Sequence, residues 1–167
     1  MAFVVEDGTG KSDANSYSTV ADFRAYCADR AIDVTADTDE AIQGNLVDGT
    51  DYVDLSYTFI GEATTDTQNL QFPRTKDEED YGVPAKVIAA TIEMALNARS
   101  GIDLFSDTDK NVTSKREKVG VIETELDYSD SKSTSSNTSR FSKVGKYLKD
   151  WIDYYADNAG QLRVISG

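Results

Sequence analysis

VPAKVIAATIEMALNARSG, residues 83–101, has the pattern of a helix that is covered on most sides. At the helical period its polar side chains fall on one narrow stripe, and apolar side chains occupy most of the remaining circumference. The polar stripe consists of Lys86, Glu93, Asn97 and Ser100. Pro84 suits a first helical position, and Gly101 suits the left-handed residue that follows a last turn. We therefore expect this helix to form the centre of one compact unit.

Three further stretches have helical periodicity: residues 19–31 with Ser18 as N-cap, residues 39–55, and about residues 141–156. Gly44 and Gly49 weaken the second pattern, because each glycine costs about 1 kcal/mol in a helix interior. The apolar positions of these stretches predict the rest of the core. For the second and last helices these are Ile42, Leu46, Val47, Val53, Leu55, Phe141, Val144, Tyr147, Leu148, Trp151, Ile152 and Tyr155.

Between the helices, two segments have no helical pattern. Residues 56–81 are expected to form an extended connector without a regular element, in which Tyr57, Phe59 and Phe72 cover the core. Residues 115–128 alternate apolar and acidic side chains, which predicts one long strand, or a hairpin that bends at Gly120. The expected fold is mainly α, a small bundle of about four helices with one β-hairpin or long strand and an extended C-terminal arm.

The length of 167 residues favours a single domain. Within it, the polar tract at 129–139 is too poor in apolar side chains to order by burial, so we expect a mobile Ser-rich loop there. Residues 140–158 form the C-terminal helical segment, and residues 159–167 an extended tail. The N-terminus lacks the pattern of a signal peptide, and no apolar run reaches membrane-spanning length, which indicates a cytosolic site of synthesis.

The net charge of −13 is unevenly distributed along the chain. Residues 110–149 contain nine Lys/Arg and five Asp/Glu, and the remaining residues therefore carry −17. Opposed charged regions suit a molecule that assembles in one orientation, whereas strong overall negativity disfavours tight DNA binding.

The composition excludes several kinds of chemistry. There is no histidine and only one cysteine, Cys27, which we expect to be a small buried side chain. Gly10-Lys11-Ser12 resembles the end of a phosphate-binding loop, but Val5 stands where its first glycine is needed. The start of a calcium-binding loop is matched by the spacing of Asp107, Asp109 and Asn111. However, Val112 stands where this loop needs glycine, and Lys118 stands where it needs a carboxylate. We predict no enzyme activity, cofactor or metal.

Four motifs occur together in this order: EDGTGKSDANSYSTVADFRAYCADR from residue 6, QFPRT at 71–75, VPAKVIAATIEMALNA from residue 83, and KREKVGVIETELDY at 115–128. This combination resembles a family of small proteins from tailed bacteriophages, over about residues 5–128. Some members are labelled DnaT-like single-stranded-DNA-binding proteins, and related ones are head–tail adaptor, or head-completion, proteins.

The adaptor resemblance implies a ring, of about twelve copies, beneath the portal in the neck of the virion, assembled in the host cytoplasm. Its partners would be other copies of itself, the portal protein and a tail or tail-completion protein, and DNA would pass through the lumen without specific binding. An acidic inner wall fits such passage, because it offers few cations to displace the counterions of DNA.

Two sets of residues are the candidate sites of the adaptor hypothesis. Leu162, Arg163, Val164 and Ile165 form an arm that docks on the portal or on a neighbouring subunit, or else a frayed terminus. An inter-subunit hairpin would use Lys115, Arg116, Lys118, Val121, Glu123 and Glu125.

The alternative hypothesis is a single-stranded-DNA-binding protein. It would use Lys115, Arg116, Lys118 and Arg140 together with exposed tyrosines, because single strands are held by cations and by stacking on aromatic rings.

Overall fold

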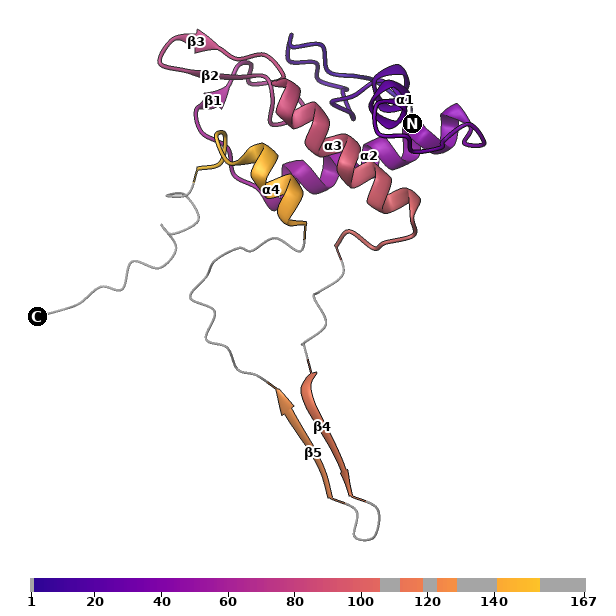
Figure 1. Cartoon of the computed structure of the whole chain (residues 1–167). Coiled ribbons are helices and arrows are strands. Elements are labelled where there is room, and N and C mark those ends of the chain that lie inside the picture. Colours follow the sequence, from indigo (N-terminus) through magenta and orange to yellow (C-terminus); the bar gives the residue numbers. More distant parts are fainter. Residues whose placement is uncertain (1, 106–111, 119–122, 129–140, 154–167) are drawn as a thin grey trace, which may run out of the picture.

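The computed structural model describes residues 2–105, 112–118, 123–128 and 141–153, which form a mainly α-helical fold (Figure 1). Its described helices are α1 (Val20–Ala28), α2 (Asp39–Ser56), α3 (Ala85–Arg99) and α4 (Ser142–Leu148). Strands β1 (Glu62–Ala63), β2 (Arg74–Lys76) and β3 (Glu79–Asp80) form a small antiparallel sheet, and β4 (Val112–Lys118) pairs with β5 (Glu123–Tyr128). The predicted fold class is confirmed. The predicted Ser-rich loop and the C-terminal tail lie outside the described residues.

Helix α3 is the centre of the fold, as its sequence pattern predicts. It contacts α1, α2 and α4, and in Figure 1 it lies between the sheet end of the molecule and the loop that follows Gly101. Val87 and Met94 belong to one buried apolar cluster, whereas Ile92 and Ala95 belong to a second. One helix therefore joins the two halves of the core.

The ends of α3 differ from the prediction at one residue. Pro84 is the N-cap with an extended backbone (ψ 141°), so the helix begins one residue later than expected. Gly101 has φ 78°, as predicted for the residue after the last turn. Its N–H donates to the Ala98 carbonyl (2.8 Å), and the Ile102 N–H donates to the Asn97 carbonyl (3.2 Å). These two bonds satisfy carbonyls that the helix end leaves open.

Helix α2 follows the predicted range closely, and its two glycines have different surroundings. A Cβ on Gly49 would lie 2.6 Å from the Thr91 carbonyl oxygen and 2.9 Å from the Ala95 nitrogen, so glycine allows α2 to approach the α3 backbone. A Cβ on Gly44 would meet nothing within 4 Å. Leu55 is 77% exposed, and its expected place in the core is wrong. Two residues rotate a helix by about 200°, so Leu55 points away when Val53 is buried.

Helix α1 begins and ends differently from the prediction. Thr19, not Ser18, is the N-cap: its hydroxyl accepts from the Asp22 N–H (3.0 Å), and the Asp22 carboxylate accepts from the Thr19 N–H (3.3 Å). This reciprocal pair satisfies two open donors of the first turn. The helix ends at Ala28 because Ala31 takes a left-handed backbone (φ 54°). Cys27 is buried, as predicted.

Residues 56–81 do not form the irregular connector that we expected. They contain β1, β2 and β3, and the turn between β2 and β3 has two residues with positive φ, Asp77 (53°) and Glu78 (67°). Such a turn matches the twist of the flanking strands. The Phe72–Pro73 peptide bond is cis. Phe59 and Phe72 are buried, as predicted, with ring centroids 4.8 Å apart.

The hairpin alternative for residues 115–128 is confirmed. The β4–β5 register pairs Arg116 with Glu125 and Lys118 with Glu123. Figure 1 shows this hairpin standing apart from the helices, and neither of its strands contacts a described helix. Residues 119–122, with the expected bend at Gly120, lie outside the described residues.

Helix α4 is shorter than predicted, because the chain leaves the helix to pair with the segment before β1. Ile152 forms an isolated antiparallel bridge with Phe59, and the Asp153 N–H donates to the Thr58 carbonyl (2.8 Å). Val144 and Leu148 are buried, and the predicted core residues Trp151 and Ile152 are partly buried against the same cluster.

Tyr52 of α2 packs against two described residues, Phe105 and Phe141, which flank residues 106–140 in the sequence. Its ring centroid is 5.8 Å from that of Phe105 and 5.3 Å from that of Phe141. Phe105 is 54% exposed. The residues that flank this segment on both sides therefore pack against one aromatic side chain.

Candidate functional site

The glycine-rich turn near the N-terminus holds a carboxylate of the protein itself. Glu6 is 4% exposed and accepts hydrogen bonds from the backbone N–H groups of Gly8 (2.8 Å), Gly10 (2.9 Å) and Lys11 (2.8 Å). Successive N–H groups of this kind form an anion-binding concavity. Because Glu6 occupies it, the turn that resembles a phosphate-binding loop has a structural role.

The opening segment, α2 and the QFPRT segment meet at a buried polar junction. The Tyr17 hydroxyl donates to the Asp54 carboxylate (2.5 Å) and accepts from the Phe72 N–H (3.0 Å), while the Gln71 N–H donates to Asp54 (3.0 Å). Burial raises the pKa of Asp54 from 3.8 to about 6, although the hydrogen bonds from Tyr17 and Gln71 act in the opposite direction. We call Tyr17, Asp54, Gln71 and Phe72 the tyrosine junction.

Arg74, the cation of the QFPRT segment, is bonded to backbone oxygens. Its guanidinium donates to the carbonyls of Ile60 (2.8 Å), Gly61 (2.5 Å) and Gln71 (3.2 Å). A guanidinium used in this way fastens the QFPRT segment to residues 60–61 and leaves little donor capacity for a ligand.

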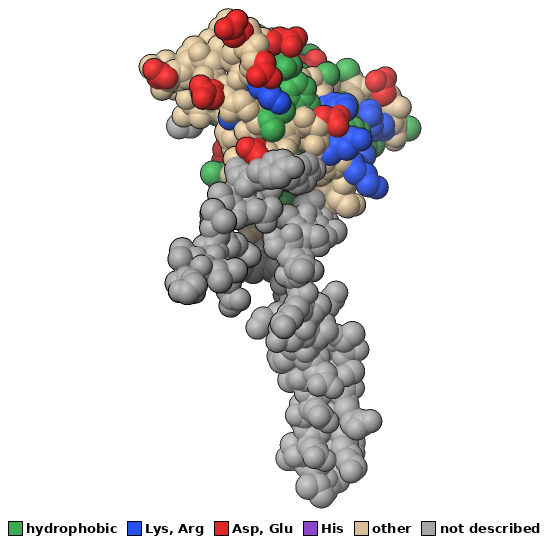
Figure 2. All heavy atoms as spheres, turned by 90° about the vertical axis from the view of Figure 1, so that its left-hand side faces the viewer, with side chains coloured by type: hydrophobic (Ala, Val, Ile, Leu, Met, Phe, Trp, Pro, Cys, Tyr) green, Lys and Arg blue, Asp and Glu red, His purple; other side chains and the backbone are tan. Residues whose placement is uncertain are grey.

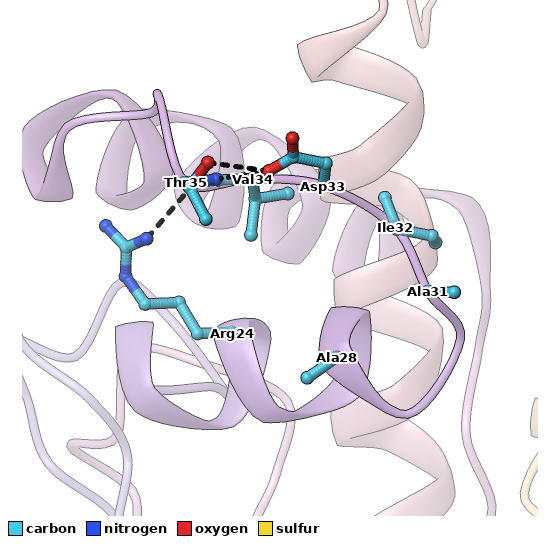
Figure 3. Close-up of a pocket in the computed structure, with 7 residues that line it drawn as sticks. All are labelled: Arg24, Ala28, Ala31, Ile32, Asp33, Val34 and Thr35. Carbon is cyan, nitrogen blue, oxygen red and sulfur yellow. Dashed lines mark hydrogen bonds between the residues drawn. The ribbon is translucent and has the colours of Figure 1, made fainter.

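A hollow of about 410 Å³ lies between α1 and the loop that follows it (Figure 3). Its polar groups already have partners within the protein. Asp33 accepts from the Thr35 N–H (2.9 Å) and hydroxyl (2.7 Å), and Arg24 donates to the Val34 carbonyl (3.2 Å). The remaining lining is apolar, from Ala28, Ala31 and Ile32. This hollow contains no set of groups that could carry out acid–base or nucleophilic chemistry.

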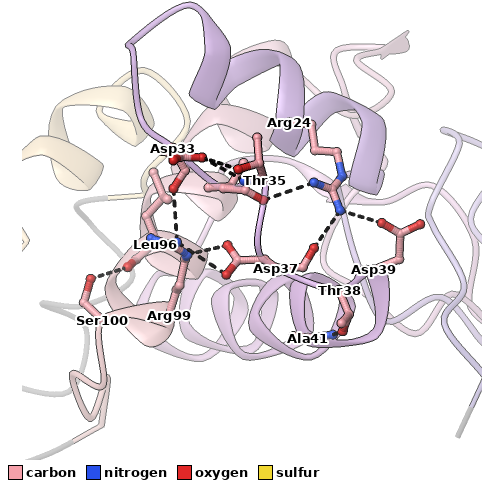
Figure 4. Close-up of polar contacts among 11 residues, drawn as sticks. Arg24, Asp33, Thr35, Asp37, Thr38, Asp39, Ala41, Leu96, Arg99 and Ser100 are labelled. Carbon is pink, nitrogen blue, oxygen red and sulfur yellow. Dashed lines mark hydrogen bonds and ion pairs between the residues drawn. The ribbon is translucent and has the colours of Figure 1, made fainter.

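Two arginines beside this hollow are paired with carboxylates (Figure 4). Arg24 of α1 lies 2.7 Å from the Asp39 carboxylate at the start of α2, and Arg99 at the end of α3 lies 2.5 Å from Asp37. Arg99 also donates to the Asp33 carbonyl (3.1 Å). These pairs link α1 to the start of α2 and the end of α3 to the loop before α2, and they neutralise both cations.

A different set of cations lies beside two half-buried tyrosines, where α1, α3 and α4 meet. The Arg30 guanidinium carbon is 3.4 Å from the ring centroid of Tyr26. The Tyr26 hydroxyl donates to the Glu93 carboxylate and lies 3.3 Å from the Tyr147 hydroxyl, and Lys143 forms an ion pair with Glu93. We call Tyr26, Arg30, Glu93, Lys143 and Tyr147 the cation–aromatic surface.

Sequence patterns alone do not reveal this surface, although a local signal for each half is present. Tyr26 and Arg30 are four residues apart, as are Lys143 and Tyr147, and residues at this spacing are neighbours on a helix. What brings the two halves together is the contact between Tyr26 and Tyr147, which are 121 residues apart in the chain.

Charge is segregated between the helical body and the later part of the chain. Residues 2–105 contain 20 Asp/Glu and seven Lys/Arg, so this part alone carries −13. In Figure 2 the acidic side chains spread over the upper part of the face shown, whereas Lys and Arg side chains gather toward one side.

The structure describes only part of the predicted site sets. Lys115, Arg116 and Lys118 lie on β4, and Glu123 and Glu125 lie on β5. The backbone pairing thus brings these five positions into one hairpin. Val121, Arg140 and the predicted arm, Leu162, Arg163, Val164 and Ile165, lie outside the described residues, and their roles stay predictions.

Among the described residues, no helix is long and apolar enough to cross a bilayer, and no group of three or more Cys, Asp or Glu side chains is arranged to hold a metal ion.

Comparison with known proteins gives one match. No curated protein and no solved structure matches the chain. A family model described as "Putative DnaT-like ssDNA binding protein" matches residues 1–166, which is nearly the whole chain. The protein belongs to this DnaT-like family.

Proposed function

We propose that this protein binds single-stranded DNA, and that the cationic part of the chain at residues 110–149 makes the main contact. The family description supports the ligand class. The segregation of charge supports the location, because nine of the 17 Lys/Arg fall in this segment, whereas residues 2–105 carry −13. Phosphates are held by cations, so the acidic body cannot supply most of the affinity.

Within residues 110–149, the β4–β5 hairpin belongs to the part that the structure describes, and it carries cations for this contact. Three cationic residues, Lys115, Arg116 and Lys118, fall within one seven-residue strand. Lys115 pairs in register with Leu126, so the position opposite it carries no charge. Single-stranded DNA is commonly held by a cationic groove that follows the backbone, with bases stacked on aromatic side chains.

A binding titration with a fluorescently labelled oligo-dT tests this proposal. Binding at about 50 mM salt should weaken steeply at about 200 mM, because bound cations release condensed counterions. The triple variant K115Q/R116Q/K118Q should reduce the slope of log affinity against log salt by about 2. K76Q removes one cation at the end of β2 and serves as the control with an unchanged slope. Absence of binding by the unaltered protein at about 50 mM salt would refute the proposal.

The second candidate is a structural one, a head–tail adaptor that forms a ring under the portal of a tailed phage particle. The observation that favours it is the β4–β5 hairpin, which contacts none of the described helices of its own subunit. A hairpin that contacts no described helix of its own chain is available to a neighbour, and opposite charges in two regions of one subunit suit head-to-tail rings. The virion neck would then be its location, and the portal, a tail protein and further copies its partners.

Mass measurement separates the two candidates. The adaptor hypothesis predicts a closed ring, alone or with the portal protein, and the DNA-binding hypothesis does not require one. Deletion of residues 161–167 should remove the ring from the neck of imaged particles if the predicted arm docks there. Normal neck density in particles that lack this protein altogether would contradict the adaptor role.

A further inference from the structure

We infer that the cation–aromatic surface is a second contact for single-stranded DNA, on which the guanidinium of Arg30 stacks one base. This inference rests on the proposed DNA-binding function and adds a site on the helical body, away from the hairpin. It uses residues from α1 and the turn that follows it, from α3 and from α4, all within the described part of the chain.

Arg30 is held in a fixed plane before any ligand arrives. Its guanidinium lies over the Tyr26 ring at 3.4 Å from the centroid, and Nη1 donates to the Tyr26 carbonyl (3.1 Å). Arg30 forms no ion pair with a described carboxylate, in contrast to Arg24 and Arg99. One face of the guanidinium covers Tyr26, and because Arg30 is an exposed residue, its other face can receive a flat partner.

A nucleobase is the partner that such a plane fits. Unpaired bases stack on aromatic rings and on guanidinium planes, and a plane that is already fixed loses less conformational entropy on binding. Lysine could supply the charge at this position but not the plane. Arg30 would therefore lie between Tyr26 and a base.

The neighbouring helix supplies a cation for a phosphate that flanks this base. Lys146 is exposed on α4, three residues after Lys143, and Tyr147 joins α4 to Tyr26. The carboxylate of this surface, Glu93, already accepts from Tyr26 and pairs with Lys143. Its charge is therefore largely compensated within the surface.

Three single variants test the stacking contact in the full chain with a dT oligonucleotide that contains one 2-aminopurine. R30K keeps the charge and removes the plane, so affinity should fall about tenfold and the change in 2-aminopurine fluorescence should be reduced. R30Q should lose at least as much affinity. K76Q, which removes a cation from β2, should bind as the unaltered protein does. Circular dichroism checks that each variant is folded.

The outcomes separate this inference from the function on which it rests. If the unaltered protein binds, K115Q/R116Q/K118Q weakens binding, and R30K matches the unaltered protein in affinity and fluorescence, the Arg30 contact is refuted and the hairpin contact stands. If R30K binds like the unaltered protein but R30Q does not, Arg30 contributes charge alone and the stacking contact is likewise refuted. No binding by the unaltered protein refutes both.

Discussion

The hydroxyl of Tyr17 lies 2.5 Å from the carboxylate of Asp54 and donates its hydrogen to it, although the two residues are 37 positions apart. The same hydroxyl accepts from the Phe72 N–H, so a single buried oxygen joins the N-terminal segment, α2 and the QFPRT segment. Removing one member of such a network leaves buried partners without a hydrogen bond, which costs more than the bond contributes on average.

Replacing Tyr17 with phenylalanine should lower the free energy of unfolding by about 2–4 kcal/mol, because the Phe72 N–H and the Asp54 carboxylate each lose a buried partner. Urea titration followed by circular dichroism measures the change. Y81F is the matched control, since the Tyr81 hydroxyl donates only to the exposed Glu79, and it should change stability by less than about 0.5 kcal/mol. Equal effects of the two substitutions would show that the tyrosine junction does not stabilise the fold.

Asp54 should make stability depend on pH. Its pKa is about 6 in the folded protein, above the ordinary 3.8, because of burial. The folded state therefore binds a proton that the unfolded state has already released between these values. Asp54 therefore adds up to about 3 kcal/mol to the free energy of unfolding. This stabilisation is complete below about pH 4 and is lost as the pH rises through about 6.

The variant D54N has no group that titrates at this position, so it should lack that part of the pH dependence. Urea unfolding at several pH values between about 4 and 7 gives the difference from the unaltered protein. D48N, an exposed position of the same helix, is the control. A D54N profile parallel to that of the unaltered protein would contradict the raised pKa of Asp54.

Two glycines of α2 should respond to alanine in opposite directions. G49A places a Cβ against the α3 backbone at 2.6 Å, so the helices must separate, and we expect a loss of about 2 kcal/mol or more. G44A meets nothing within 4 Å and should stabilise the protein by up to about 1 kcal/mol through helix propensity. Urea unfolding of both variants checks this. Stabilisation by G49A would mean that α2 and α3 are not in close contact there.

Glu6 should protect the N-terminal turn from hydrogen exchange. In E6A the N–H groups of Gly8, Gly10 and Lys11 lose their acceptor, so their amides should exchange faster, while amides in α3 keep their rates. Hydrogen exchange followed by NMR measures this residue by residue. E40A, at an exposed position in the first turn of α2, is the control. Unchanged exchange at Gly8 and Gly10 would show that Glu6 is not their acceptor in solution.

The long helices could be predicted from the sequence because their signals are local. Gly101 marks the end of α3, and apolar spacing locates α2 and the buried face of α4. Strands of two or three residues such as β1 and β3 contain no period that could be recognised. The apolar side chain of Leu55 predicts a place in the core, but its position around the helix exposes it.

The β4 cations and the cation–aromatic surface likewise differ in how far the sequence alone predicts them. The cationic residues of β4 are adjacent in sequence and could be selected from charge alone. Tyr26 and Tyr147 come together only because α1 and α4 both pack beside α3. Contacts across so much of the chain depend on tertiary packing, which single-sequence periodicity does not contain.

The ring of Tyr52 contacts both Phe105 and Phe141, and this has a consequence for engineering the protein. Since the chain departs and returns beside one side chain, a short linker should span the interval, and the intervening 35 residues can be exchanged as a cassette. If the proposed DNA contact lies in this segment, grafting the corresponding cassette from another family member should change the affinity for DNA while the recipient scaffold keeps its own melting temperature.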